Sequence, residues 1–147
     1  MFRGVTKLTL DSKGRLAIPS KHRDVLMQEA QGKLMATAES RRCILIYPEP
    51  EWLEIEKQVT ALPYTNPKAR ALQELLIGNA REVEIDSSGR ILVPPELRDF
   101  VALNKDVSLV GQGKKFALWD SGKWEARMDE AIALYEGGLG PEFDIPL

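Results

Sequence analysis

Apolar and polar residues alternate over several short stretches of this chain, which is typical of strands that bury one face. Taken in order, the pattern predicts strands at 5–10 and 16–18, a helix at 19–29, strands at 33–38 and 43–47, and a helix at 51–61. After a proline-containing junction and a helix at 68–77, the series returns as strands at 80–85 and 90–93, a helix at 95–101, strands at 106–111 and 115–119, and a helix at 125–135. The pattern therefore predicts an α+β protein made of two similar halves.

A short motif marks the same point in each half. Residues 11–15 read D-S-K-G-R, and residues 86–90, which lie 75 positions later, read D-S-S-G-R. The match extends through residues 10–24 and 85–99, where Asp, Ser, Gly, Arg, Pro, Arg and Asp recur in register. A match at a fixed period is the mark of a tandem repeat. Neither half has enough strands to close its own sheet, so we expect the halves to be intertwined around one core.

The motif has the composition of a tight turn. Gly14 and Gly89 can take the left-handed backbone conformation that closes a hairpin. Asp11 and Asp86 can accept hydrogen bonds from backbone amides two residues further along and so stabilise the turn. The arginine that ends each motif has two possible roles, a salt bridge to that aspartate across the turn or contact with a ligand.

Composition places the chain among ordinary soluble proteins. Of its 147 residues, 44% are hydrophobic and 29% are charged, which suits one domain or two small ones. No apolar run is long enough to span a membrane, and the N-terminus lacks the apolar stretch of a signal peptide. We therefore expect a cytoplasmic protein with no membrane partner. Cys43 is the only cysteine and Trp52 lies on a helix, and both are expected in the core.

Charge is unevenly distributed along the chain. The whole sequence carries a net charge of −2, whereas its first 25 residues carry six basic and two acidic side chains, a net charge of +4. The basic residues of this segment are Arg3, Lys7, Lys13, Arg15, Lys21 and Arg23. Such asymmetry indicates a local basic patch on an otherwise acidic protein, which is suited to nucleic-acid phosphates. The alternative is an ordinary solvated face.

The sequence offers little material for catalysis or metal binding. His22 is the only histidine, so a Ser-His-Asp arrangement or a His/Cys metal cluster is not expected. The glycine-rich stretch 111–115 joins two predicted strands and lacks the helix and the Ser or Thr of a phosphate loop. We expect neither an enzyme nor a bound cofactor or metal. A small-molecule or hydrolytic site near His22 and Asp24 is a remote alternative.

The doubled D-x-x-G-R motif, together with the M-F-R-G opening, resembles the MraZ family of bacterial transcriptional regulators over nearly the whole chain. A single motif of this kind occurs across the wider AbrB-like or SpoVT-like class, which includes antitoxins. The resemblance implies a tandem-repeat AbrB-like swapped-hairpin β-barrel with flanking helices. It also implies a nucleoid-associated homo-oligomeric ring that binds double-stranded DNA at repeated boxes upstream of a cell-division and cell-wall gene cluster, with repression as the expected effect. No small-molecule substrate is implied.

On this reading the first repeat spans 1–63, a connecting helix 64–79, the second repeat 80–136 and a flexible tail 137–147. The residues expected at DNA are Arg15, Lys13, Arg90, Arg3, Lys7, Lys21 and Arg23, with Asp11, Gly14, Asp86 and Gly89 shaping the turns. An arginine can bond bidentately to guanine or pair with phosphate, and a two-stranded ribbon can enter a major groove. The competing interpretation is an antitoxin-like or scaffolding protein-interaction module whose hairpins serve only assembly.

The charges around the two motifs differ. The first motif is accompanied by Lys13, Lys21 and Arg23, and the second by Glu82, Glu84 and Glu96. The glutamates would repel phosphate and could hold Arg90 in internal ion pairs. We therefore predict that Arg15 contributes more to DNA binding than Arg90.

Overall fold

The computed structural model describes all 147 residues. The first half contains β1 (Phe2–Thr9), β2 (Arg15–Ala17), α1 (Ser20–Ala30), β3 (Lys33–Glu39), β4 (Cys43–Pro48) and α2 (Glu49–Thr60). A helix, α3 (Pro67–Leu72), continues into a π-helical turn, η1 (Gln73–Ile77). The second half contains β5 (Arg81–Glu84), β6 (Arg90–Leu92), α4 (Pro95–Val101), β7 (Asp106–Gly113), β8 (Phe116–Asp120) and α5 (Ser121–Leu134). The predicted α+β class is confirmed, and the elements return in the same order in each half.

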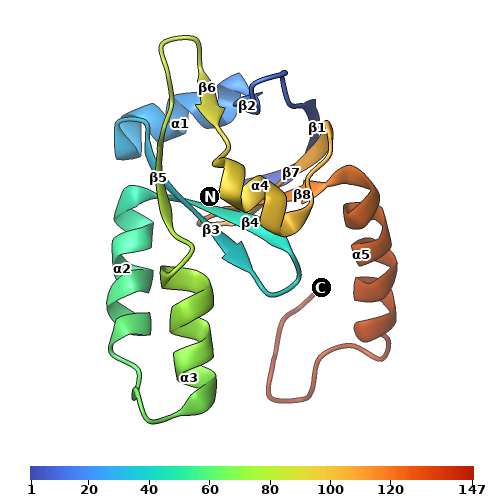
Figure 1. Cartoon of the computed structure of the whole chain (residues 1–147). Helices are drawn as coiled ribbons and strands as arrows, with labels where there is room; N and C mark the ends of the chain where they lie inside the picture. The colour runs from blue at the N-terminus through green and yellow to red at the C-terminus, as the bar shows by residue number, and fades with distance from the viewer.

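Each half completes the sheet of the other. The main sheet has six strands in the order β1-β7-β8-β4-β3-β5, all antiparallel (Figure 1). Thus β1 of the first half pairs with β7 of the second, and β5 of the second half pairs with β3 of the first. The halves meet where β4 pairs with β8. This exchange is the swapped-hairpin arrangement, and it makes the two halves one intertwined body.

The sequence pattern alone predicted that each motif turn closes an ordinary hairpin, and this prediction is wrong. Each turn closes at its tip, where the amide of Asp11 donates to the carbonyl of Arg15 at 3.0 Å and that of Asp86 to Arg90 at 2.8 Å. Beyond the tips the arms separate, and β2 pairs with β6 in a second, two-stranded sheet. The physical reason is that an alternating pattern fixes which face of a strand is buried but leaves its partner open.

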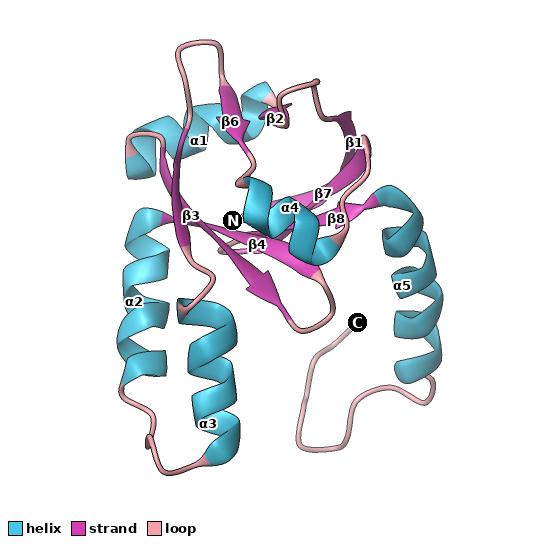
Figure 2. Cartoon of the chain, viewed as in Figure 1, coloured by secondary structure: helices cyan, strands magenta, loops and turns pink.

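Two apolar cores lie on opposite faces of the six-stranded sheet. The alternation along β4 divides its side chains between them, with Ile44 and Ile46 in the larger core and Cys43, Leu45 and Tyr47 in the smaller. The larger core is covered by α1, α4 and the β2–β6 ribbon, and the smaller core mainly by α2 and η1 (Figure 2). The central strands are thus buried on both faces, so they read as nearly continuous apolar runs.

Several details of the helices depart from the prediction. Helix α5 begins at Ser121 rather than 125 because the Asp120 carboxylate caps it, accepting from the Lys123 amide at 3.3 Å. The junction helix ends in the π-helical turn, where the Leu76 carbonyl accepts a bond from the buried Thr37 hydroxyl at 2.5 Å. This bond fastens the junction to β3.

The expected burial of two residues is confirmed. Trp52 is fully buried, and its indole nitrogen donates to Glu56 at 2.5 Å. Cys43 is also fully buried, and burial raises the pKa of its thiol. None of the helices combines the length and the apolar character needed to cross a membrane.

Candidate nucleic-acid interface

The two motif turns lie at the same end of the molecule, opposite the end where α2, α3 and α5 project (Figure 1). In the first turn, Oδ1 of Asp11 accepts from the amides of Lys13 at 2.9 Å and Arg15 at 2.8 Å. The Gly14 amide donates back to the Asp11 carbonyl at 3.0 Å, and Gly14 has a φ of 81°. Only a residue without a Cβ takes this left-handed conformation readily.

The second turn repeats this geometry. Oδ1 of Asp86 accepts from the amides of Ser88 and Arg90, both at 2.9 Å, and Gly89 has a φ of 76°. Each turn also accepts a backbone hydrogen bond from the other half of the chain. The Ile18 amide donates to the Gly89 carbonyl and the Val93 amide to the Gly14 carbonyl, both at 3.0 Å. The two turns thus form a single, interlocked surface.

The β2–β6 ribbon presents the two motif arginines on one face. Its register pairs Arg15 with Leu92 and Ala17 with Arg90, while Leu16 and Ile91 form the central pair. The central pair points into the larger core, so the flanking residues point outward. Arg15 and Arg90 are therefore diagonal neighbours on the outer face, and their side chains are 30% and 34% exposed.

Each motif arginine lies against an aspartate. Nε of Arg15 donates to Oδ2 of Asp11 at 2.7 Å. Nε of Arg90 lies 3.4 Å from Oδ2 of Asp86, and its Nη1 lies 3.9 Å from Oδ2 of Asp11. Asp11 therefore contacts both arginines, whereas Asp86 contacts one. The contact through Nε leaves the terminal nitrogens of Arg15 without an intramolecular hydrogen bond.

These contacts keep both aspartates ionised. The backbone amide of Arg15 is the main cause that lowers the pKa of Asp11 from 3.8 to about 2, and the Arg15 guanidinium and the Lys13 amide act in the same direction. The backbone amide of Arg90 likewise lowers the pKa of Asp86. The turn surface consequently presents fixed arginine–carboxylate pairs at any physiological pH.

A second pair of arginines supports the turns from the opposite halves. An alanine Cβ at Gly89 would overlap the guanidinium of Arg23 on α1, and one at Gly14 would overlap that of Arg98 on α4. Neither arginine has an ion pair or a side-chain hydrogen bond within the chain, and Nε of Arg98 is buried without a partner. Arg23 was among the residues expected at DNA and Arg98 was not, although the R-D pair at 23–24 recurs at 98–99 and could have identified Arg98.

One basic patch had been expected from residues 1–25, but the basic residues of this segment are spread over several elements. Lys13 is exposed at the tip of the first turn, and Lys21 is exposed at the start of α1. Arg3 and Lys7 lie on β1, and Arg3 is about 20 Å along that strand from its Thr9 end. Nζ of Lys7 lies 3.8 Å from Oε1 of Glu125 on α5. The strand is extended, so residues adjacent in sequence are carried away from the turn.

The prediction that glutamates hold Arg90 in internal ion pairs is also wrong. Its acidic neighbours within 4.0 Å are Asp86 and Asp11. Glu82 and Glu84 lie on β5, where they pair in register with Met35 and Lys33 of β3, and Glu96 is exposed on α4. Arg15, and not Arg90, has the shorter bond to a carboxylate.

His22 has a packing position. It is buried, and its ring lies edge-on to Phe2 at 5.7 Å and to Phe116 at 4.9 Å between centroids. Burial lowers the pKa of His22, so the ring is neutral at pH 7. Asp24 is exposed on the same helix and makes no hydrogen bond to the histidine. No group of three or more His, Cys, Asp or Glu side chains is placed to hold a metal ion.

Comparison with known proteins points to one family. The MraZ family model, described as "MraZ protein, putative antitoxin-like", matches residues 1–75 and again 76–135. A protein of Nitrosomonas europaea named "Transcriptional regulator MraZ" is 52% identical over 144 residues, which are 98% of this chain and 97% of the relative. Relatives of the same name in Nitrosospira multiformis and Coxiella burnetii are 53% and 48% identical, covering 93% and 90% of this chain and 93% and 88% of theirs.

Proposed function

The chain belongs to the MraZ family, and we propose from this premise that it regulates transcription by binding double-stranded DNA through its two motif turns. We further propose that it acts on the nucleoid as a repressor, at repeated boxes upstream of a cell-division and cell-wall gene cluster. A homo-oligomeric ring would bind several boxes at once. Within each chain we propose repeats at 1–63 and 80–136, a connecting helix at 64–79 and a flexible tail at 137–147.

The observation that carries this proposal is the convergence of two repeated turns on one surface. Residues 75 positions apart in the chain become neighbours because the halves exchange strands. The surface presents Arg15, Arg90 and Lys13 outward, with Arg23 and Arg98 beside the turn glycines. A two-stranded ribbon with outward arginines suits the width of the major groove.

The aspartates support DNA binding as positioning residues. A free arginine loses about 0.5–1.5 kcal/mol of side-chain entropy when it is immobilised on a ligand. The bond from Nε of Arg15 to Asp11 orients the guanidinium in advance and leaves its terminal nitrogens for a guanine edge or a phosphate. The salt bridge and the ligand contact, which the sequence left as alternatives, are thus compatible on one side chain.

Helix α5 supports the ring. It buries none of its own residues, and Ile132 and Leu134 are 71% and 74% exposed, whereas the equivalent helix α2 packs against η1 and buries Trp52. We propose that a second copy covers α5 with the exposed apolar side chains of its α2 and of the α2–α3 connection, Leu53 and Tyr64. Such a contact joins unlike surfaces, so it closes into a ring when the rotation between subunits allows it.

The function is tested by sequencing the genomic fragments that the purified protein retains at moderate salt, followed by salt-titrated gel shifts on the enriched box. Arg15→Ala should weaken binding by about 1–3 kcal/mol for each protomer that touches DNA. Arg3→Ala is the matched control, since it removes the same charge at a site remote from the turns. Arg90→Ala ranks the second motif against the first.

Two outcomes would contradict this proposal. Equal losses for Arg15→Ala and Arg3→Ala would show that binding depends on general charge alone. Retention of no DNA above background would favour an antitoxin-like or scaffolding role. Oligomer size and melting temperature are measured for every variant, so that a folding defect is not taken for a binding defect.

Assembly is tested separately by light scattering. Ile132→Glu places a charge on the exposed face of α5 and should reduce the oligomer to smaller species. Val5→Glu is the control, because Val5 is also exposed, at 48%, but lies on β1. A monomeric wild-type protein at micromolar concentration, or an unchanged oligomer in Ile132→Glu, would refute the α5 contact.

A further inference from the structure

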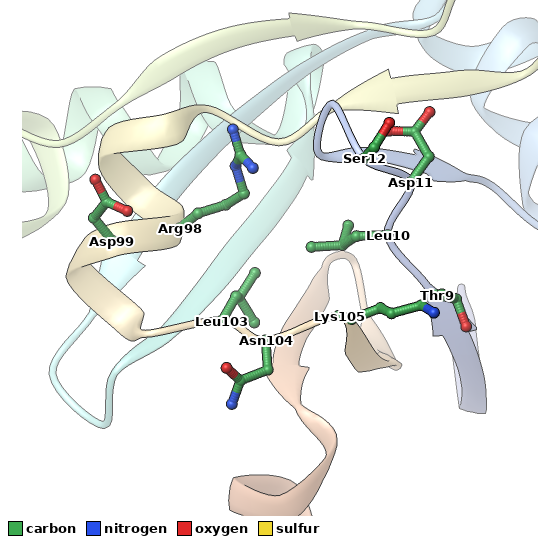
Figure 3. Close-up of a pocket in the computed structure, with 9 residues that line it drawn as sticks. All are labelled: Thr9, Leu10, Asp11, Ser12, Arg98, Asp99, Leu103, Asn104 and Lys105. Atoms are coloured by element: carbon green, nitrogen blue, oxygen red, sulfur yellow. The ribbon is translucent and has the colours of Figure 1, made fainter.

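A pocket of about 680 Å³ opens beside the first motif turn, between that turn, α4 and the loop that leads from α4 to β7 (Figure 3). The side chains of Leu10 and Leu103 point toward each other at its floor. The guanidinium of Arg98 rises from α4 toward the turn, and Lys105 lies along the rim toward Thr9. The volume falls within the usual range of small-molecule sites, about 300–1,000 Å³.

The pocket exists because the two repeats differ at one place. The Leu10 amide donates to the carbonyl of Lys105 at 2.9 Å, and the Ile85 amide donates to the carbonyl of Gly32 at the same distance. Ile85 is therefore equivalent to Leu10, and Gly32 to Lys105. Helix α1 has 11 residues and α4 has 7, a difference of about one turn. The extra turn of α1 carries Met27, whose sulfur lies 2.9 Å from the place of a Cβ on Gly32.

Met27 therefore lies over this place in one repeat, with 48% of its surface still exposed, whereas the equivalent place in the other repeat is open. The shorter α4 ends at Val101, and the residue 75 positions after Met27 is its C-cap, Ala102, whose side chain is a single methyl group. The loop that follows α4 is longer, and its residues Leu103 and Lys105 line the opening instead. The pocket is thus a local departure from the repeat symmetry, with its own floor and rim.

Asp11 of the lining is bonded within the first turn, but four other polar side chains around the pocket are not engaged elsewhere in the chain. The side chains of Arg98, Asp99, Asn104 and Lys105 make no ion pair or hydrogen bond, although the Asn104 backbone amide donates to Asp120 at 3.2 Å, and Nε of Arg98 is buried with no partner. The Nε group is shielded from solvent beside Gly14, so a ligand in the open pocket would bond to the terminal nitrogens of Arg98, which make no hydrogen bond within the chain. The guanidinium beside an apolar floor is suited to an anionic group joined to a short apolar portion.

We propose that this pocket binds a small amphipathic monoanion, whose carboxylate bonds to Arg98 and whose apolar portion covers Leu10 and Leu103. We also propose, resting on the DNA-binding function above, that the ligand regulates that function. Arg98 packs on Gly14, so a ligand that holds its guanidinium changes the support under the first turn. A ligand bound here would act directly on the first motif and would reach Arg90 of the second only through Asp11.

A free small molecule fits this site better than a phosphate of the DNA backbone. The floor is apolar and would gain nothing from a phosphodiester. Asp11 of the lining is already paired with Arg15, so its unpaired charges are Arg98, Lys105 and Asp99, a net charge of +1 that is too small to attract a polyanion. A single negative charge is the better match.

The test uses hexanoate as probe and the full-length protein with labelled leucine methyl groups, observed by NMR without DNA. Hexanoate should shift the methyl signals of Leu10 and Leu103, while hexanol and inorganic phosphate, which each lack one half of the chemistry, should bind more weakly. Arg98→Gln should raise the dissociation constant about tenfold or more. Arg23→Gln, the equivalent change beside the filled site, should alter it less than about twofold.

Arg98→Lys keeps the charge but loses the planar fork, and it serves as a second variant if Arg98→Gln does not fold. Absence of methyl shifts at saturating hexanoate, or equal affinity for Arg98 and Arg23 variants, would overturn the site. Phosphate shifting the same methyls as strongly as hexanoate would assign the pocket to the DNA backbone. A bound probe that leaves the affinity for the enriched box unchanged would remove the regulation while the site stands.

Discussion

The packing of Arg98 on the first turn makes a prediction about Gly14→Ala. Gly14 has a φ of 81°, and a Cβ there would overlap the guanidinium of Arg98. The left-handed conformation costs an alanine about 1–2 kcal/mol. Turning the Arg98 side chain out of its rotamer adds about 0.5–1.5 kcal/mol. The sum, about 1.5–3.5 kcal/mol, lowers the melting temperature of a chain of this size by roughly 3–14 °C.

The matched control is Gly4→Ala. Gly4 also has a positive φ, 88°, but nothing lies within 4 Å of its added Cβ. Only the backbone contribution remains, about 1–2 kcal/mol. The two variants therefore share the conformational cost and differ in the contact with Arg98.

A double-mutant cycle isolates that contact. Denaturant unfolding of Gly14→Ala, Arg98→Ala and the double variant is measured at one protein concentration, because an oligomer's stability depends on concentration. We expect Gly14→Ala to cost less when Arg98 is already an alanine, by about 0.5–1.5 kcal/mol. A cost that is unchanged in this background would refute the packing of Arg98 on the turn as the cause.

Three further predictions concern the aspartates and the cysteine. Asp11→Asn should weaken DNA binding more than Asp86→Asn in gel shifts, because Asp11 contacts both motif arginines; equal losses would contradict this. The pKa of Asp11 is lowered from 3.8 to about 2, so its stabilising contribution is present above about pH 4 and is lost as the pH falls toward 2. An NMR titration of the carboxyl carbon with a midpoint near 4 would disprove that. Cys43 is buried and the pKa of its thiol is raised, so iodoacetamide should modify it in urea and not in the native protein at pH 8; rapid native alkylation would count against its burial.

Much of the local structure could be predicted from the sequence because its causes are local. The motif turns depend on an aspartate that bonds to nearby amides and on a glycine with positive φ, and both are visible as residue types. The alternation along β4 likewise places Ile44 and Ile46 on one face and Leu45 on the other. The number of strands in each half predicted intertwined halves, and the family resemblance then supplied the swapped-hairpin form of the exchange.

The candidate site was only partly predictable. The turn arginines and Lys13 follow directly from the repeated motif. The net charge of the first 25 residues predicted, however, that Arg3 and Lys7 lie near the turn. Both lie on the extended strand β1, which carries them away from it. Nearness in sequence also suggested glutamate partners for Arg90, whereas two residues of the interlocked turns fill that role.

By itself, the sequence determined that this protein is built twice from one unit, where each unit turns and which faces its strands bury. These features depend on backbone conformation and on burial, which act within a few residues. Only the tertiary structure decided that β1 pairs with β7 and β5 with β3, that Arg98 supports a turn from the other repeat, and that a shorter α4 leaves a pocket. The physical reason is that backbone hydrogen bonds between strands and contacts between packed side chains are non-local. The alternation of residues along a strand shows which face is buried, and only the complete fold determines which strand it pairs with.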